Sequence, residues 1–203
     1  TLLVGFDKAK KLAARLGKPL VGINHCAAHL SIGEIATGTT NPVFLYVSGV
    51  NTQVISYEGG KFRILGETLD VGLGNALDKF GRDIGLGFPA GAKIEEMARK
   101  GKYIVLPYTV KGMDVSFSGI LTKVQNLYKK GASPEDLCFS FQETAFAMMA
   151  EVAERAMAHM DKQELLLVGG VAANKKFCEM LQIMCEERGA KFFVPENQFL
   201  VDN

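Results

Sequence analysis

The spacing of hydrophobic residues divides the chain into segments of different character. Apolar residues alternate with lysines at helical intervals near the start, which predicts an amphipathic helix over residues 4–16. The apolar run 19–23 predicts a short buried strand, and a second helix is expected from there to about residue 35. Residues 38–42 have the composition of a linker.

Strand-like runs replace the helical spacing in the next segment. Residues 43–47, 52–57 and 62–65 are apolar and rich in β-branched or aromatic side chains, and turns over 48–51 and 59–60 separate them. Short turns between such runs predict an antiparallel meander.

The rest of the chain is predicted to be mostly helical and then α/β. Helices are expected over 71–84 and 92–100, and Ser133 before Pro134 predicts the capped start of a long helix that runs to about His159. In the last part, a buried strand (164–168), two glycines, a helix (173–188) and a strand (191–194) predict an α/β crossover unit.

Composition limits the classes of protein to consider. With 203 residues, 48% hydrophobic and 22% charged, the chain can form one or two domains with a real core. The net charge of +1 gives no overall basic field for nucleic acid, and four cysteines without a CxxC motif indicate reduced thiols. Neither a transmembrane run nor a secretory signal is recognisable, so we expect a soluble, cytoplasmic protein, and the abrupt ends suggest a fragment of a longer one.

His25 and His29 are the first candidate for chemistry. They are four residues apart in a predicted helix, so both imidazoles can reach one metal ion. A first-row metal needs a third or fourth ligand, and two incidental histidines on a partly buried helix would give the same pattern.

Glycine-bearing turns at strand ends or before helices are the second candidate. They lie at Ser48–Gly49, at 87–91 before Glu95, and at 169–170 before Asn174. Such turns let a phosphate approach backbone N–H groups, and three together suggest a nucleotide clamped between lobes, although none has the P-loop or GxGxxG pattern. Asp78 could bind a ribose, but the residues alone favour a solvated helix-surface carboxylate.

Six segments, in this order, resemble the universal threonylcarbamoyladenosine synthase family in its archaeal and eukaryotic branch. They are NHCAAH (24–29), YVSGVNTQV (46–54), GETLDVGLGNALDKFGR (66–82), GLGFPAGAKIEE (85–96), LPYTVKGMDVSFSG (106–119) and LLVGGVAANKKF (166–177). The resemblance implies an α/β fold of the actin/Hsp70/sugar-kinase (ASKHA) type, two related lobes with a nucleotide in the cleft. Residues 1–41 would be the end of the first lobe with the metal-binding histidine helix, and 43–203 the second lobe with a helical insertion. The start of the first lobe and a C-terminal closing segment would be absent.

The resemblance also implies the site residues. One divalent metal, Fe(2+) or Zn(2+), would be bound by two imidazoles, a phenolate and a carboxylate, a set suited to either ion. These ligands would be His25, His29, Tyr46 and Asp202. The phosphates of the adenylate would lie along Tyr46, Val47, Ser48, Gly49 and Val50. Its ribose and base would be held by Asp78, Gly91, Glu95 and Asn174.

Members of this family transfer a threonylcarbamoyl group from threonylcarbamoyl-AMP to N6 of adenosine 37 in tRNAs that read ANN codons. The implied partners are therefore tRNA and the other subunits of the KEOPS complex, a kinase-like ATPase and small subunits. Two positions depart from the family pattern. Val50 stands where Gly or Ala is usual, and Pro89-Ala90-Gly91-Ala92 replaces Pro-Gly-Gly-Pro, so we expect a functional member with altered loops.

Three other functions compete with this interpretation. A metallopeptidase would need a glutamate base, but Cys26, Ala27 and Ala28 stand between the histidines. A non-catalytic nucleotide-binding scaffold paralogue is supported only by Val50, because scaffold relatives lack the metal histidines. A sugar kinase would need a catalytic aspartate that the sequence does not announce.

Overall fold

A computed structural model describes residues 2–200. Its helices are α1 (Leu2–Leu16), α2 (His25–Thr37), α3 (Leu73–Asp83), α4 (Gly91–Ala98), α5 (Ser118–Lys129), α6 (Pro134–His159) and α7 (Lys175–Glu187), with short 3-10 turns η1 (Gly170–Ala173) and η2 (Asn197–Phe199). Its strands are β1 (Val43–Val47), β2 (Thr52–Glu58), β3 (Lys61–Glu67), β4 (Val110–Lys111), β5 (Asp114–Val115), β6 (Glu164–Val168) and β7 (Lys191–Phe193).

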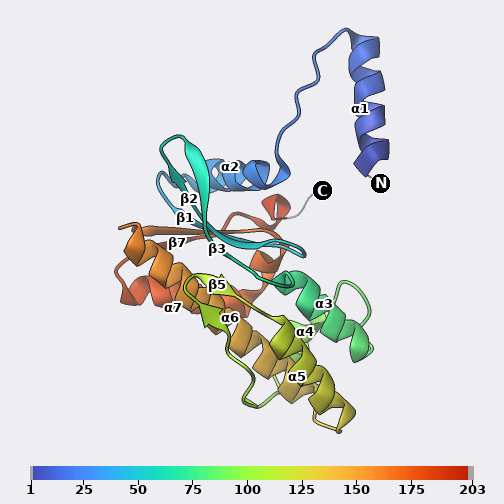
Figure 1. The fold of residues 1–203 in the computed structure, drawn as a ribbon, viewed down its shortest axis with the longest axis vertical. Helices are drawn as coiled ribbons and strands as arrows, with labels where there is room; N and C mark the ends of the chain where they lie inside the picture. Colours follow the sequence, from blue (N-terminus) through green and yellow to red (C-terminus); the bar gives the residue numbers. More distant parts are fainter. Residues whose placement is uncertain (1, 201–203) are drawn as a thin grey trace.

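A five-stranded sheet in the order β3-β2-β1-β6-β7 forms the centre of the fold (Figure 1). The strands β1, β2 and β3 pair antiparallel, which confirms the predicted meander. The strands β6 and β7 pair parallel on either side of α7, which confirms the predicted crossover unit. The strand β1 also pairs parallel with β6, and their first partners, Val43 and Leu165, are 122 residues apart in the sequence. A pairing between strands so distant in the sequence could not be predicted from local pattern alone.

Helices cover both faces of this sheet, which explains why β1 is apolar throughout rather than alternating. Val43, Leu45 and Val47 point into the larger core, formed with α3 to α7. Phe44 and Tyr46 point to the other face, where α2 packs. Figure 1 shows α2 on one side of the sheet and α6 and α7 on the other.

The long helix α6 confirms the sequence prediction at both ends. The Ser133 hydroxyl oxygen accepts a hydrogen bond from the N–H of Asp136 (3.3 Å), and Pro134 occupies the first turn, so the helix begins where capping chemistry predicts. Its apolar side, including Phe141 and Phe146, is fully buried in the larger core. This helix is therefore the main support beneath the sheet.

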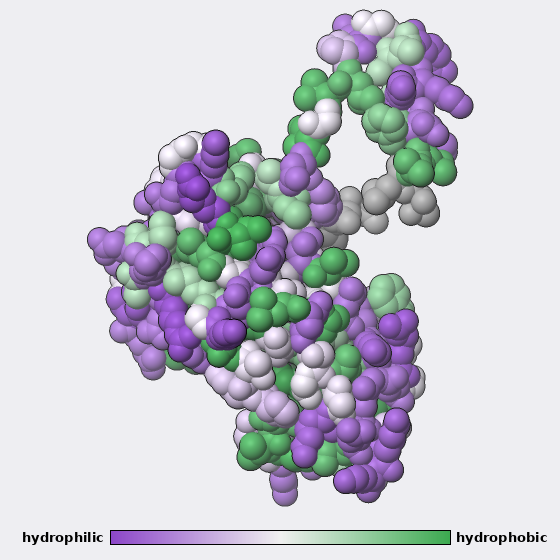
Figure 2. Space-filling view, viewed as in Figure 1, coloured by the Kyte–Doolittle hydropathy of each residue, from purple (hydrophilic) through white to green (hydrophobic). Residues whose placement is uncertain are grey.

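The segment before α2 differs from the prediction. Helix α1 forms as expected, but residues 19–23 are not a strand, and Val21 and Ile23 are 75% and 76% exposed. A strand needs a neighbour for its N–H and C=O groups, and within residues 2–200 no strand pairs with this segment. Figures 1 and 2 show α1 standing apart from the body, with hydrophobic side chains at its surface. The division into lobes at residues 41 and 43 stays a prediction.

The predicted helix 173–188 is also corrected. Asn174 has an extended backbone (φ −74°, ψ 117°), so the helical path is interrupted there and α7 starts at Lys175. The Asn174 side chain accepts a hydrogen bond from the N–H of Phe177, which makes this residue the N-cap. Because Asn174 is a candidate ligand residue, this break bears directly on the site.

Candidate functional site

The candidate site lies at the edge of the sheet where β1 and β6 end. Tyr46 is paired with Val168 in the parallel ladder, so the two strands end side by side. The turn Ser48–Asn51 follows β1, and Gly169 and Gly170 follow β6. Ligands of open α/β sheets bind beyond the carboxyl ends of the parallel strands, and the structure brings two of the predicted glycine turns together at such an edge.

Two hydrogen bonds close the Ser48–Asn51 turn. The N–H of Ser48 donates to the carbonyl oxygen of Asn51 (2.7 Å), and the N–H of Asn51 donates to the Ser48 hydroxyl oxygen (3.1 Å). The start of α3 lies against this turn, because the N–H of Gly74 donates to the carbonyl oxygen of Ser48 (3.2 Å). The turn is therefore fixed from both sides.

Glycines permit this close approach of α3. A Cβ added to Gly72 would lie 2.2 Å from the Val50 carbonyl oxygen, and one added to Gly74 would lie 2.7 Å from that of Ser48. Both distances are too short for a real side chain, so the contact needs glycine at these positions.

A pocket of about 370 Å³ opens between this turn, α3, α4 and the start of α7. It brings together five residues that were predicted to hold an adenylate: Gly49, Asp78, Gly91, Glu95 and Asn174. The remaining lining residues are small or apolar, and are Gly74, Leu77, Pro89, Ala92, Gly170, Val171 and Ala173. An apolar pocket with a few polar groups is typical of a small-molecule site.

The polar residues of this pocket also bind the backbone of neighbouring elements. The Asp78 carboxylate accepts a hydrogen bond from the N–H of Ala90 (2.7 Å), which ties α3 to α4. The Glu95 carboxylate accepts one from the N–H of Lys175 (3.0 Å), which ties α4 to α7. Asp78 is half-buried, so it is not the freely solvated carboxylate that the residues alone favoured. Each carboxylate keeps a second oxygen for a ligand.

Three of the four predicted metal ligands form a second cluster. The ring centroids of His25 and His29 are 4.7 Å apart, and those of His29 and Tyr46 are 5.4 Å apart. The side chain of Asn24 caps α2 by accepting a hydrogen bond from the N–H of Ala27 (3.1 Å), so α2 starts at His25. The helix start therefore places His29 against Tyr46 of β1 and His25 next to His29.

Tyr46 is 1% exposed and burial raises the pKa of its phenol, although hydrogen bonding with Ser48 and Asn51 acts in the opposite direction. A phenolate ligand at this position therefore needs a neighbouring positive charge.

Two imidazoles and a phenol oxygen are an N/O donor set that suits iron or zinc, so these side chains fit such an ion. The fourth predicted ligand, Asp202, lies outside the described residues. Within residues 2–200, no three His, Cys, Asp or Glu side chains gather closely enough to hold a metal.

Val47 and Val50 occupy different environments from the glycines beside them. The Val47 side chain is buried in the larger core, so only its backbone can face a ligand. Val50 is 69% exposed, and Asp161 is the only described residue other than glycine with a positive φ. A β-branched side chain is disfavoured at positive φ, and because residue 50 does not have a positive φ, the valine causes no such conflict in the turn.

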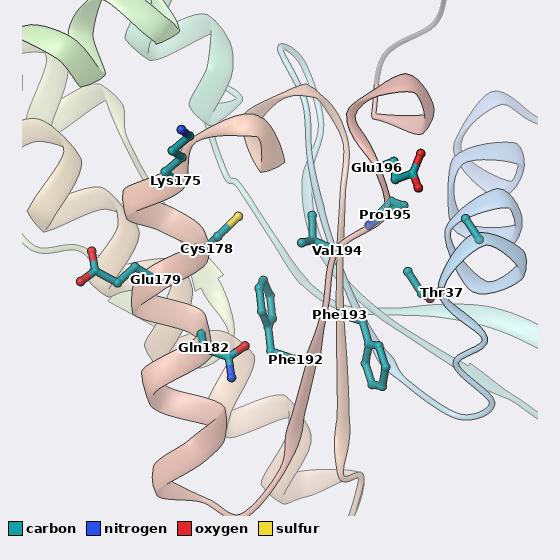
Figure 3. A pocket seen from close by; sticks show the side chains of 11 residues that line it. Thr37, Lys175, Cys178, Glu179, Gln182, Phe192, Phe193, Val194, Pro195 and Glu196 are labelled. Carbon is teal, nitrogen blue, oxygen red and sulfur yellow. The ribbon is translucent and has the colours of Figure 1, made fainter.

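A wider groove of about 630 Å³ lies between α7, β7 and α2 (Figure 3). Cys178 and Gln182 of α7 border it on one side, Phe192 points into it, and Thr37 of α2 lies across the strand. None of the predicted ligand residues lines it. The carboxyl-end pocket is therefore the better candidate, although it is the smaller of the two.

Sequence reasoning missed two residues that hold the site together. Gln142 is buried in α6, and its side-chain oxygen accepts a hydrogen bond from the Asn174 amide (2.7 Å). Asp70 accepts hydrogen bonds from the N–H groups of Val71 and Phe117 (2.6 and 3.0 Å), which joins the segment before α3 to the start of α5. A polar residue on the apolar side of α6 was the available signal for Gln142; Asp70 had none.

The model of the tRNA N6-adenosine threonylcarbamoyltransferase family (TsaD) matches residues 1–203. A protein of this name from Archaeoglobus fulgidus is 60% identical over 196 residues, 96% of this chain and 61% of that protein. One from Thermococcus sibiricus is 58% identical over 197 residues, again 96% of this chain and 60% of that protein. A probable bifunctional tRNA threonylcarbamoyladenosine biosynthesis protein of Methanocorpusculum labreanum is 56% identical over the whole chain, which covers 39% of that protein. The chain thus spans about 60% or less of the length of these relatives.

Solved structures with low sequence identity have the same fold. Full-length HypF in its phosphate- and nucleotide-bound form matches with a TM-score of 0.76 at 11% identity, over 92% of this chain and 35% of that one. The activator of 2-hydroxyisocaproyl-CoA dehydratase from Clostridium difficile, with bound ADPNP, matches with a TM-score of 0.58 at 12% identity, over 87% of this chain and 62% of that one. These matches confirm the predicted α/β fold of the ASKHA type. Over residues 2–200, none of the helices is both long and apolar enough to cross a bilayer.

Proposed function

The chain belongs to the tRNA N6-adenosine threonylcarbamoyltransferase family, and from this premise we propose that it carries the adenylate- and metal-binding part of such an enzyme. The complete protein would transfer the threonylcarbamoyl group of threonylcarbamoyl-AMP to N6 of adenosine 37 in tRNAs that read ANN codons. The enzyme would act in the cytoplasm as the catalytic subunit of KEOPS, beside a kinase-like ATPase and small subunits.

One observation carries this proposal. The carboxyl end of β1 joins the two candidate ligand sets, because Tyr46 of the histidine cluster and Gly49 of the pocket are three residues apart. An acyl-adenylate has its reacting carbonyl next to its phosphate. A site for it needs phosphate-binding backbone between the pocket for the nucleoside and the groups that act on the acyl carbon, and the Ser48–Asn51 turn occupies that position.

Each part of the pocket then has a role. The backbone of Ser48, Gly49 and Val50 would face the phosphate, where N–H groups stabilise negative charge. Asp78 and Glu95 each have a carboxylate oxygen beyond the one that binds backbone, which would accept hydrogen bonds from the ribose hydroxyls. Gly91 would leave room beside the ribose, since a Cβ added there would meet nothing within 4 Å. Asn174 would contact the base.

His25, His29, Tyr46 and Asp202 would hold one Fe(2+) or Zn(2+) ion. When bound, such an ion supplies Lewis-acid polarisation of a carbonyl oxygen. In the transfer, N6 of the adenosine forms a bond to the carbamoyl carbon, the bond from that carbon to the phosphate oxygen breaks, and AMP and a proton leave. This chain would contribute positioning of the adenylate, which can supply a large part of the rate.

The test is reconstitution of the intact protein with its partner subunits, tRNA and threonylcarbamoyl-AMP. Mass spectrometry of digested tRNA should detect threonylcarbamoyladenosine in ANN-decoding tRNAs, and AMP should appear in equal amount. Cells depleted of the protein should lose the modified nucleoside. Unchanged threonylcarbamoyladenosine in depleted cells would contradict the proposal.

A further inference from the structure

The backbone of Asn51 is held in place at the end of the turn that follows β1. Its carbonyl oxygen accepts a hydrogen bond from the N–H of Ser48 (2.7 Å), and its own N–H donates to the Ser48 hydroxyl oxygen (3.1 Å). The next residue, Thr52, begins β2 and pairs with Val47 of β1. The Asn51 side chain therefore starts from a fixed point beside the carboxyl end of β1.

The Asn51 amide reaches from this point to the histidine helix. Its Nδ2 donates a hydrogen bond to the Sγ of Cys26 (3.8 Å), which is 25 residues away in the sequence and lies in α2 between His25 and His29. A thiol is a weak acceptor, so this contact adds little stability by itself. It shows that the amide lies between the turn and the first turn of α2.

The Asn51 side chain is also hydrogen bonded to the phenol of Tyr46, as is the Ser48 hydroxyl. An amide nitrogen carries two N–H donors, which is enough for both the thiol and the phenol oxygen. Tyr46 is 1% exposed, so its phenol depends on such protein partners rather than on water. Asn51 thus contacts both elements that form the histidine cluster, α2 and β1.

We propose that Asn51 is a positioning residue that holds the Tyr46 phenol oxygen in place for the ion proposed at the histidine cluster. The inference rests on the proposed function, because it assumes that Tyr46 binds the metal. A negatively charged ligand atom is oriented by the hydrogen-bond donors around it, and loss of such a donor typically lowers metal affinity by about 10- to 100-fold. Asn51 needs no contact with the ion, since its effect passes through Tyr46.

The experiment is a double-mutant cycle on the intact protein, with the dissociation constant of Zn2+ measured by calorimetry. Asn51→Leu replaces the amide by an apolar side chain of similar size and should weaken Zn2+ binding by about tenfold. Tyr46→Phe removes the phenol oxygen and should weaken it at least as much. Because Asn51 acts through Tyr46, adding Asn51→Leu to Tyr46→Phe should have little further effect. A residue that only supported the fold would weaken binding in both backgrounds.

Bound Co2+ gives a second readout, since its visible spectrum depends on the identity and geometry of its ligands. The spectrum of Asn51→Leu should differ from that of wild type in the same direction as the spectrum of Tyr46→Phe. Asn126→Leu is the matched control, because it makes the same change at an exposed position of α5. It should leave the Zn2+ affinity and the Co2+ spectrum unchanged.

Asn51→Ser, whose hydroxyl is too short to reach α2, replaces the leucine variant if that variant melts markedly lower, and the same loss of Zn2+ affinity is expected. Wild-type Zn2+ affinity in a folded Asn51→Leu or Asn51→Ser protein would overturn this inference alone. An equally large effect of Asn51→Leu with and without Tyr46→Phe would do the same. Unchanged Zn2+ affinity in Tyr46→Phe, or a wild type that binds no Zn2+, would contradict the proposed ligand set and this inference with it.

Discussion

The two parts of the candidate site lie on either side of the Ser48–Asn51 turn but are held in different ways. In the candidate nucleotide pocket, the carboxylates of Asp78 and Glu95 accept hydrogen bonds from backbone N–H groups of other elements, and the Asn174 side chain accepts one from the first turn of α7. These side chains therefore hold α3, α4 and α7 in place as well as lining the pocket.

The histidine cluster is formed by only two elements, α2 and β1. His25 and His29 occupy the first turns of one helix, and His25 is exposed. Only Tyr46 belongs to the sheet. Binding and folding are therefore coupled in the pocket and at the buried Tyr46, whereas the exposed His25 is a position where they can be separated. Substitutions in the two parts should therefore differ in what they do to stability.

The largest effect should come from His25→Ala. If His25 is a metal ligand as proposed, its loss removes carbonyl polarisation worth several kcal/mol, and tRNA modification by the intact protein should fall by about a hundredfold or more. Because His25 is exposed at a helix start, the free energy of unfolding should change by less than about 0.5 kcal/mol. Metal content by mass spectrometry, the rate of modification and a denaturation curve measure the three quantities.

His159→Ala is the control for this change. His159 is the remaining histidine, exposed in the last turn of α6, and its removal should leave metal content and activity unchanged. Full activity in His25→Ala would show that the cluster is not the metal site. A large loss of stability would contradict the separation of binding from folding at His25.

Asp78→Ala should affect both properties of the pocket. It removes the oxygen proposed to bind the ribose, which should weaken ATP binding by about tenfold, and it leaves the buried N–H of Ala90 without an acceptor. That unpaired group should lower the free energy of unfolding by about 1–3 kcal/mol. Asp83→Ala, at the exposed end of α3 where the carboxylate binds Gln125, should do neither. Weaker ATP binding at unchanged stability would contradict the coupling of binding and folding in the pocket.

The sequence predicts the elements better than their arrangement. Capping at Ser133 and the apolar runs of β1 and β6 were sufficient to find those elements, because both signals are local. The apolar run 19–23 gave the same signal as a buried strand, but a strand also requires a neighbour, which local pattern does not specify.

The site residues depended on the resemblance for a similar reason. Asp78 and Glu95 are unremarkable helical carboxylates until folding brings α3, α4 and α7 together. No period or spacing predicts that Gln142 meets Asn174, because 32 residues and two elements separate them. The break in the predicted helix 173–188 was missed because the pattern of apolar residues continues through the cap.

Outside the pocket, Asp70 is another carboxylate that accepts hydrogen bonds from backbone N–H groups. The dependence of stability on pH in acid should show how much its charge contributes. Partial burial raises its pKa, but hydrogen bonds from Ser118, Phe117 and Val71 outweigh this, so the net pKa is lowered. A lowered folded-state pKa stabilises the protein above the unfolded value of about 4, and this stabilisation is lost as pH falls through the folded value.

Asp70→Asn should therefore make stability less dependent on pH below about 4. Because the side chain is exposed, the difference at neutral pH should be no more than about 1 kcal/mol. Urea midpoints measured between pH 3 and 7 give the comparison with wild type. If the urea midpoints of the two proteins fall equally as the pH is lowered, the charge of Asp70 does not contribute to stability.

The smallest effect is expected at Val50, where the sequence departs from the family pattern within the Ser48–Asn51 turn. Val50 is exposed and has no positive φ, while its carbonyl oxygen would lie only 2.2 Å from a Cβ added to Gly72. The backbone of residue 50 thus matters to the contact with α3 and its side chain does not. Val50→Ala should change the free energy of unfolding by less than about 0.5 kcal/mol and leave ATP affinity within about twofold. A shift above about 1 kcal/mol, or clearly tighter binding, would mean that the valine side chain reaches the ligand, and the turn would then belong to the pocket by its side chains as well as by its backbone.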